Sequence, residues 1–412
     1  MKKLVFIVTL LFMPSVYGAS YSFQDCLNIV DKNNAELLAA KENLEAAKSL
    51  LSGTYGSFLP DITANLKYSR GQTDLTSSEG YNANLTATEN IFNGFADVAS
   101  ISDAEGKVQV AEANLRTVKA KISADLKSAF ASVVYAQDSI KLSKSILKRR
   151  TDNFNIVKLR FQSGRENKGS VLLSEAYQKQ AQLDVLKAEH ALQTAKRDLG
   201  RVLGLAPEAS LEIIGQVPEL TVPGVSPDFL ALAEKTPSRQ QSQGQLKSAD
   251  ANLQGARSKF YPTLNLQGSV GRTGEDFFPD NNQWSAGATL SWSLFNGGTD
   301  YFTQKSSFAQ KMVAEHNLRN LYLETITQLR ETYAAFVEAV EEVKVSAAFS
   351  EAASTRAEIA RSKYNNGLSS FDDWDVIEND LINRQKDLTT KKRARVVAEA
   401  NWEKTQGVGV LP

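Results

Sequence analysis

Residues 284–294 read WSAGATLSWSL, and in this stretch every second residue is apolar while serine, glycine and threonine lie between. Successive side chains of a β-strand point to opposite faces of its sheet, so this alternation predicts a strand with one apolar and one polar face. A half-buried hairpin in a soluble sheet would show the same alternation. The pattern alone leaves both interpretations open.

Three other segments alternate in the same way, and two of them directly follow a proline. One begins after Pro60, a second follows the loop at 71–80, and a third begins after Pro262. We therefore expect two β-hairpins, at about 58–92 and 260–295, with Pro60 and Pro262 at their starts. Each hairpin ends in the same tripeptide, Phe92-Asn93-Gly94 in the first and Phe295-Asn296-Gly297 in the second.

The two tripeptides are 203 positions apart, and other landmarks recur at the same spacing. Gly164 returns as Gly367 and Gly204 as Gly407, while Pro60 and Pro262 are 202 positions apart. Ordered landmarks at a nearly constant offset indicate a tandem duplication. We expect a first repeat at 19–204, a linker or equatorial segment at 205–225, and a second repeat at 226–412.

The remainder of each repeat is predicted to be helical. No proline occurs in 61–206 or, before the last residue, after 279, and proline is the residue that breaks helix interiors. Apolar residues recur there at spacings of three and four, as in coiled coils. We expect long helices at about 95–163 and 298–365, each about 100 Å long at 1.5 Å per residue. Shorter helices are expected at about 22–55, 166–203, 226–258 and 369–407.

The N-terminus has the features of an export signal. Lys2 and Lys3 precede an apolar run from Leu4 to Met13, and Gly18 is a suitable cleavage position. Residues 1–18 are therefore predicted to be a signal peptide. Cys26, the one cysteine of the chain, is expected to be a small buried residue of the first helix.

Composition argues against several classes of function. Lys plus Arg and Asp plus Glu both number 47, so no bulk positive charge would attract nucleic acid. The two histidines, His190 and His316, lie in helical sequence without a nearby nucleophile motif, and one cysteine cannot build a Cys/His metal cluster. We expect no enzyme activity, no cofactor and no metal.

An exported chain with amphipathic strands, and without an apolar run long enough for a spanning helix, indicates an outer-membrane β-barrel. Four strands cannot close such a barrel, whose known minimum is eight. Closure therefore requires several copies, and three copies supply twelve strands. The competing interpretation is a periplasmic coiled-coil scaffold or adaptor without a channel, which would leave the apolar strand faces exposed.

The duplicated prolines, hairpin exits and turn glycines together resemble the TolC family of outer-membrane efflux proteins over nearly the whole mature chain. The resemblance implies an α plus transmembrane-β fold: a homotrimer with one twelve-stranded barrel in outer-membrane lipid and an α-helical periplasmic tunnel. It also implies efflux or type I secretion together with a periplasmic adaptor (membrane fusion protein) and an inner-membrane transporter. The cargo could be a drug, a metal or a protein.

The same resemblance suggests which residues form a periplasmic gate. Gly164 and Gly367 match the two turns at the tunnel end that faces the adaptor. Asp373, six residues after Gly367, matches an aspartate of the closed mouth. Asp372 and Asp375 flank it, and the sequence leaves open which of the three line the gate. Tyr364 matches a residue that holds the gate shut, although Ser369 replaces its arginine partner. Ser170 is the first-repeat equivalent of Asp373. An acidic first helical turn would explain the same aspartates without a gate.

Overall fold

The computed structural model describes residues 20–72, 77–207, 211–222 and 224–411. The predicted signal peptide at 1–18 lies outside these residues. The described chain divides into two compact units, and each unit draws on both halves of the sequence. We call Met1–Leu38, Lys119–Pro227 and Arg330–Pro412 the helical unit, and Ala39–Val118 with Asp228–Leu329 the sheet unit.

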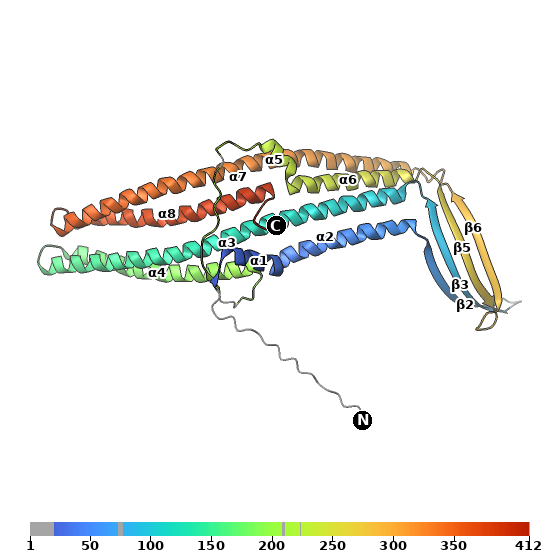
Figure 1. Cartoon of the computed structure of the whole chain (residues 1–412), viewed down its shortest axis with the longest axis horizontal. Coiled ribbons are helices and arrows are strands. Elements are labelled where there is room, and N and C mark those ends of the chain that lie inside the picture. Colours follow the sequence, from blue (N-terminus) through green and yellow to red (C-terminus); the bar gives the residue numbers. More distant parts are fainter. Residues whose placement is uncertain (1–19, 73–76, 208–210, 223, 412) are drawn as a thin grey trace, which may run out of the picture. The chain divides into compact units, whose positions relative to one another are not determined.

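Helices dominate the described chain, and two of them have 67 residues each (Figure 1). These long helices, α3 and α7, confirm the long helices predicted from the proline-free stretches. In chain order the elements are β1 (Ser20–Tyr21), α1 (Phe23–Asn33), α2 (Ala35–Thr54), η1 (Tyr55–Phe58), β2 (Asp61–Gln72), β3 (Ser77–Phe92), α3 (Ala96–Gln162), α4 (Lys168–Leu203), β4 (Glu212–Ile213), α5 (Phe229–Lys235), α6 (Pro237–Ser258), β5 (Thr263–Gly274), β6 (Asn281–Ser291), α7 (Thr299–Asn365) and α8 (Phe371–Gln406).

Two of the shorter helices predicted from the sequence are each broken into two. The helix expected at about 22–55 stops before Asn34, whose backbone is extended and whose side chain accepts a hydrogen bond of 3.0 Å from the Leu37 N–H. The helix expected at about 226–258 is interrupted at Thr236, because Pro237 has no N–H to continue α5 and instead begins α6. The predictions of single helices there were wrong.

The sheet unit contains one four-stranded antiparallel sheet in the order β2-β3-β5-β6. The central pair, β3 and β5, joins the two hairpins, and β2 and β6 form the edges. The last strand is shorter than its alternating sequence suggested. It ends at Ser291, and the ring N–H of Trp292 donates to the Phe260 carbonyl at 3.1 Å instead of continuing the strand.

The register gathers the alternating apolar residues on one face of this sheet. Ile62 lies opposite Ala87, Leu66 opposite Ala83, and Val270 opposite Trp284. Several large members of this face are strongly exposed, including Leu66 at 87% and Trp284 at 78%. The opposite face carries asparagine, glutamine, serine and threonine. The sheet is therefore amphipathic, and its apolar face is open in the single chain.

In the helical unit, α4 returns along the end of α3, and α8 returns along the end of α7 (Figure 1). Ile146 of α3, Ala181 of α4 and Ile382 of α8 pack together, so the two helical hairpins share a core.

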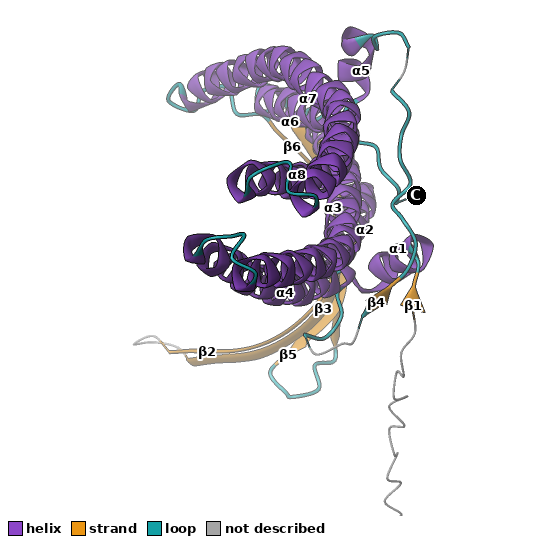
Figure 2. Cartoon of the chain, turned by 90° about the vertical axis from the view of Figure 1, so that its left-hand side faces the viewer, coloured by secondary structure: helices purple, strands orange, loops and turns teal. Residues whose placement is uncertain are grey.

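Cys26 is fully buried in α1, as the sequence predicted, and burial raises the pKa of its thiol to about 11. The same unit contains a short parallel pair, β1 and β4, beside α1 (Figure 2), which the sequence did not predict.

A buried ion cluster holds part of the segment that links the two halves of the sequence. Lys127 of α3 is 2% exposed and lies 3.0 Å from a carboxylate oxygen of Glu399 and 2.6 Å from one of Glu403. The other Glu399 oxygen accepts the backbone N–H of Leu220 at 2.9 Å. The linker is therefore fixed to α8 through the same carboxylate that neutralises Lys127.

Candidate functional site

Two similar turns connect the helices at the ends of α3 and α7. The backbone at Gly164 and Gly367 is left-handed, with φ of 72° and 76°. In both turns the glycine N–H bonds back to the third residue before it, and the following N–H reaches one residue further back. This is the Schellman arrangement that ends many helices. A Cβ at either glycine would meet no atom within 4 Å, so the turns require the backbone conformation and not the small size.

An aromatic cluster lies next to the second turn. The rings of Tyr364 and Trp374 stack with centroids 4.4 Å apart and planes inclined by 19°, and Phe371 meets both edge-on. Tyr364 is fully buried and Trp374 is 1% exposed. Val157 of α3 belongs to the same cluster, so the first helical hairpin contributes to the packing around the second turn.

Tyr364 is also bound by polar groups of the first helical hairpin, which α3 and α4 form. Its hydroxyl donates to Glu166 Oε2 at 2.9 Å, in the turn between α3 and α4. The Arg160 guanidinium lies 4.5 Å from the ring centroid and donates to the Tyr364 carbonyl at 2.7 Å. Burial, reinforced by the hydrogen bond to Glu166, raises the pKa of Tyr364 well above its usual value of 10.0. The sequence suggested a missing arginine partner at Ser369; in the structure Arg160 supplies an arginine contact from a different element.

Asp375 occupies a buried position between the hairpins. It lies 3.1 Å from Arg150 of α3 and accepts a second hydrogen bond of 2.9 Å from Asn379. Arg150 also donates to the Asn379 side-chain oxygen and covers the ring of Tyr177 in α4. Asp375 is 9% exposed. This carboxylate therefore neutralises an arginine within the chain and is not presented to solvent.

Asp372 and Asp373 are both exposed at the start of α8. Asp373 forms a capping box with Ser370: its backbone N–H donates to the Ser370 hydroxyl at 3.1 Å, and its carboxylate accepts the Ser370 hydroxyl at 2.6 Å and, at 3.4 Å, the Ser370 N–H. This satisfies donors at the helix start. The capping role that the sequence offered as an alternative is thus present at Asp373, and it leaves the carboxylate accessible. Ser170, its first-repeat equivalent, is buried.

A second ion pair extends the contact between the hairpins away from the turns. Arg149 Nε lies 3.3 Å from Glu378 Oε1, and Arg149 also donates to Gln385 at 3.0 Å. Burial lowers the pKa of Arg149, and the Glu378 charge opposes that shift. From sequence alone the basic run Lys148-Arg149-Arg150 is predicted to be a solvated outer face, and at Arg150, which is 5% exposed, that prediction is wrong. No sequence pattern pointed to Arg160, Glu166 or Glu378. Their partners are more than 190 positions away, and no local pattern indicates such pairings.

The predicted hairpin starts and exits lie in the sheet unit. Pro60 directly precedes β2, and Pro262 directly precedes β5. The Asn93 side chain accepts the Asp97 N–H at 3.3 Å and so caps α3, while the Asn296 carbonyl accepts the Thr299 N–H at 3.0 Å.

The glycines after these asparagines, Gly94 and Gly297, both have positive φ. They differ in their surroundings. A Cβ at Gly94 would lie 2.4 Å from the Ser258 carbonyl oxygen, whereas one at Gly297 would meet nothing within 4 Å.

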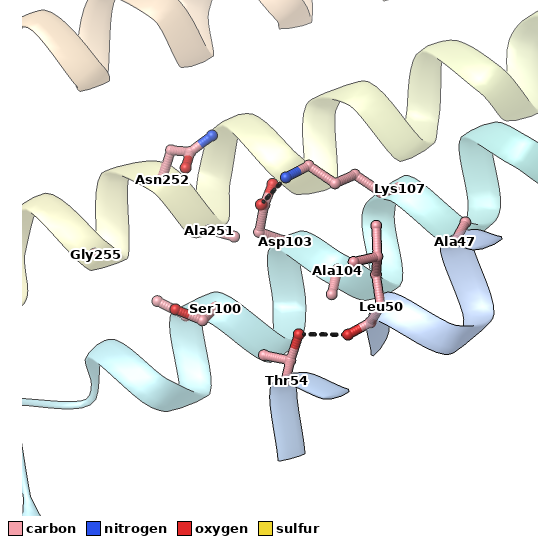
Figure 3. Close-up of a pocket in the computed structure, with 11 residues that line it drawn as sticks. Ala47, Leu50, Thr54, Ser100, Asp103, Ala104, Lys107, Ala251, Asn252 and Gly255 are labelled. Atoms are coloured by element: carbon pink, nitrogen blue, oxygen red, sulfur yellow. Dashed lines mark hydrogen bonds and ion pairs between the residues drawn. The ribbon is translucent and has the colours of Figure 1, made fainter. Parts of the chain in front are cut away.

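The sheet unit also has a groove among α2, α3 and α6 (Figure 3). Small residues such as Ala104, Ala251 and Gly255 line it, and Asp103 and Lys107 face each other 2.7 Å apart. No histidine or cysteine lines this groove. In the part of the chain that the structure describes, no group of three or more His, Cys, Asp or Glu is arranged to hold a metal. Nor does any described helix combine the length and the apolar character needed to cross a bilayer.

The sequence matches the outer membrane efflux protein family over residues 27–205 and 231–407. The chain belongs to this family. Among curated relatives, Nodulation protein T of Rhizobium leguminosarum bv. trifolii is 21% identical over 91% of this chain and 81% of its own length. Toxin and drug export protein A of Aggregatibacter actinomycetemcomitans is 24% identical over 86% of this chain and 77% of its own.

Solved structures agree with this membership. The outer-membrane channel OprN superposes with a TM-score of 0.84 at 18% identity, over 95% of this chain and 91% of its own. VceC from Vibrio cholerae gives 0.83 at 17% identity, over 94% and 96%. The predicted resemblance, the helical and β fold class, the outer-membrane location and the role in efflux or secretion are confirmed. The family comprises transport proteins.

Proposed function

We propose that the chain is the outer-membrane channel-tunnel of a tripartite efflux or type I secretion system and works as a homotrimer. The amphipathic four-stranded sheet carries this proposal. Its edge strands β2 and β6 have no partner strand on their outer side in the described part of the chain, and its apolar face is exposed. Three such sheets supply the twelve strands of one barrel, which removes all open edges. The polar faces would then line a water-filled lumen.

The trimer is tested on protein extracted from outer membranes in mild detergent. We expect an oligomer of three chains that resists dissociation, and single-channel currents after reconstitution into planar bilayers. A monomer in the periplasmic soluble fraction would support the scaffold interpretation instead. N-terminal sequencing of the same material tests the proposed removal of residues 1–18. The proposed duplication, with repeats at 19–204 and 226–412, would explain why each half of the sequence contributes two strands to the sheet.

The proposed partners are a periplasmic adaptor and an inner-membrane transporter. The relatives' names, which include an export protein and efflux-pump components, support this assignment. We assign adaptor docking to the turns at Gly164 and Gly367, where the neighbouring Ser163 and Asn366 are exposed. Photo-crosslinkers at Ser163 or Asn366 are expected to capture the adaptor. Capture only from helix positions away from the turns, such as Glu331 near the middle of α7, would contradict this assignment.

We further propose that the turns close the tunnel and that Asp372 and Asp373 line the closed mouth. Support comes from their exposure beside a turn that Tyr364 ties to the first hairpin. Three copies would bring six carboxylates together, and such a ring favours cations and binds multivalent ones. Asp375 is not part of this proposal, because it is buried against Arg150.

The gate is tested by block of the open channel with a trivalent cation. Asp373→Asn and Asp372→Asn each remove a charge, and asparagine at 373 keeps an acceptor for the Ser370 N–H. We expect each change to weaken block and cation preference, and the double variant to weaken both further. The control is Glu351→Gln, which removes an exposed negative charge from α7, away from the start of α8 where Asp372 and Asp373 lie. Unchanged block in the double variant would eliminate the acidic gate.

A further inference from the structure

Arg272 interrupts the apolar face of the sheet. Along β5, Leu266 and Val270 lie on this face, and two residues further the next position on the same face is Arg272. The register places Arg272 between Ala83 of β3 and Asn282 of β6. Its side chain is exposed and donates from Nε to Asn282 Oδ1 at 3.1 Å. Among the described residues no carboxylate forms an ion pair with it.

Four aromatic side chains contact one another in series at the loop end of the sheet, and we call Tyr68, Tyr81, Phe277 and Phe278 the aromatic rim. The rings of Tyr68 and Tyr81 are 4.9 Å apart, those of Tyr81 and Phe277 are 5.7 Å apart, and those of Phe277 and Phe278 are 4.9 Å apart. Tyr81 shares its strand face with Ala83, the residue opposite Arg272. Phe277 and Phe278 are 70% and 84% exposed, so the rim presents aromatic surface beside the arginine.

A second arginine lies on the same face at the rim. Arg70 follows Tyr68 by two residues on β2 and is exposed, and Glu79 of β3 lies directly opposite it. The Glu79 carboxylate accepts the Tyr68 hydroxyl at 2.9 Å. Two guanidinium groups, the Glu79 carboxylate and four aromatic rings therefore share the loop end of a mostly apolar sheet face.

The position of this patch in the membrane follows from the proposed trimer, on which this inference rests. In that assembly the apolar face contacts lipid. The helices follow the other ends of the strands, so the hairpin loops face the exterior. A charge on a lipid-facing strand is costly at the bilayer centre and tolerated near the interface, where aromatic rings also concentrate. Arg272, Arg70 and the aromatic rim would lie at the level of the outer-leaflet headgroups.

We infer that this patch binds the phosphorylated sugar headgroup of an outer-leaflet glycolipid. A guanidinium presents a planar pair of N–H donors that matches phosphate oxygens, and the resulting charge-assisted hydrogen bonds are strong. The flat, exposed rings of the aromatic rim offer stacking surfaces for sugar rings. A glycerophospholipid has a phosphate but no sugar ring, so it engages only part of the patch.

The inference is tested with the purified full-length oligomer and three probes: diphosphorylated lipid A, its monophosphorylated form, and phosphatidylglycerol. Native mass spectrometry counts the bound lipid on wild-type protein, R272Q and R272K. Wild type is expected to retain diphosphorylated lipid A in preference to the other two. R272Q is expected to bind it about tenfold more weakly, as expected for the loss of one hydrogen bond to a charged group. R272K is expected to retain part of the binding.

The matched control is K67Q, which removes a positive charge from β2 on the opposite, polar face of the same sheet. It is expected to bind lipid A like wild type. Equal binding by R272Q and wild type, an equal loss in K67Q, or equal retention of phosphatidylglycerol and lipid A would each overturn the inference. Channel currents are recorded for every variant. A wild-type protein that forms no oligomer and no channel contradicts the proposed function, whereas normal channels with unselective lipid binding contradict only this inference.

Discussion

The hydroxyl of Tyr364, near the end of α7, donates a hydrogen bond to Glu166, which lies 198 positions earlier in the turn that follows α3. This contact joins the two helical hairpins next to their turns. Arg160 strengthens it by binding the Tyr364 ring and carbonyl from the same hairpin as Glu166. If the turns separate when the tunnel opens, these bonds must break first.

Replacing Tyr364 by phenylalanine removes the hydroxyl and keeps the stack on Trp374. A hydrogen bond to a charged acceptor contributes about 1.5 kcal/mol, so amide exchange in the two turns is expected to accelerate about tenfold. Hydrogen-exchange mass spectrometry of 160–168 and 362–371 measures this. Tyr68→Phe removes a comparable hydroxyl bond in the sheet and leaves the turns unaffected. Unchanged exchange in Tyr364→Phe would show that the stack alone holds the hairpins.

Alkaline pH is expected to loosen the same contact. The pKa of Tyr364 is raised in the folded protein, so its stabilising effect is complete below the usual value of 10.0. As pH rises above that value, the unfolded or detached tyrosine releases its proton while the buried one retains it, and the contribution is progressively lost. Exchange in the turns measured from pH 9 upward is expected to rise more steeply in wild type than in Tyr364→Phe. Parallel profiles would contradict this assignment.

Breaking the Arg150–Asp375 pair is expected to be more damaging than removing both partners. Arg150→Met leaves Asp375 buried without its cation, which costs about 3–5 kcal/mol. The double change Arg150→Met with Asp375→Leu replaces the pair by apolar groups and is expected to recover most of that loss. Thermal unfolding followed by circular dichroism compares them. Arg356→Met, in an exposed pair with Asp380, is the control and is expected to cost less than about 1 kcal/mol.

The equivalent hairpin exits are expected to respond differently to alanine. Gly94→Ala would place a Cβ 2.4 Å from the Ser258 carbonyl oxygen, so the backbone must move and the yield of the proposed trimer in the outer membrane is expected to fall sharply. Gly297→Ala meets no atom within 4 Å and carries only the left-handed penalty of about 1–2 kcal/mol. Oligomer yield after mild extraction distinguishes them. Similar yields for the two variants would contradict the packing argument.

Much of the fold could be predicted because its signals are local. Proline-free sequence indicated α3 and α7, and period-two alternation indicated the four strands. The interruptions at Asn34 and Pro237 also had local signals, a helix-capping asparagine and a proline at a first helical position, but the apolar periodicity on both sides outweighed them. The pair of β1 with β4 has two residues in each strand, which is too short for any sequence pattern.

The candidate gate was predictable only in part. Gly164 and Gly367 could be placed in turns, because left-handed helix ends favour glycine. Asp375 was grouped with Asp372 and Asp373 by proximity in sequence. Phe371 and Trp374 are three apart and define the inward face of α8, and Asp375, four after Phe371, lies on that face. This spacing could have identified Asp375 as a buried residue, in contrast to the exposed Asp372 and Asp373. Its partner Arg150 is 225 positions away and could not be inferred.

The open space around Gly164 and Gly367 has a consequence for natural variation. At these turns most residues are disfavoured because the backbone is left-handed, and not because space is lacking. Asparagine tolerates left-handed backbone better than most residues, so it could replace either glycine. Gly94 meets both restrictions, since its φ is positive and its Cβ position is filled by another helix. Gly297, at the equivalent strand exit, meets only the first restriction. Among natural variants we therefore expect substitution at Gly164, Gly367 and Gly297 and glycine alone at position 94, although Phe92-Asn93-Gly94 and Phe295-Asn296-Gly297 are identical in this chain.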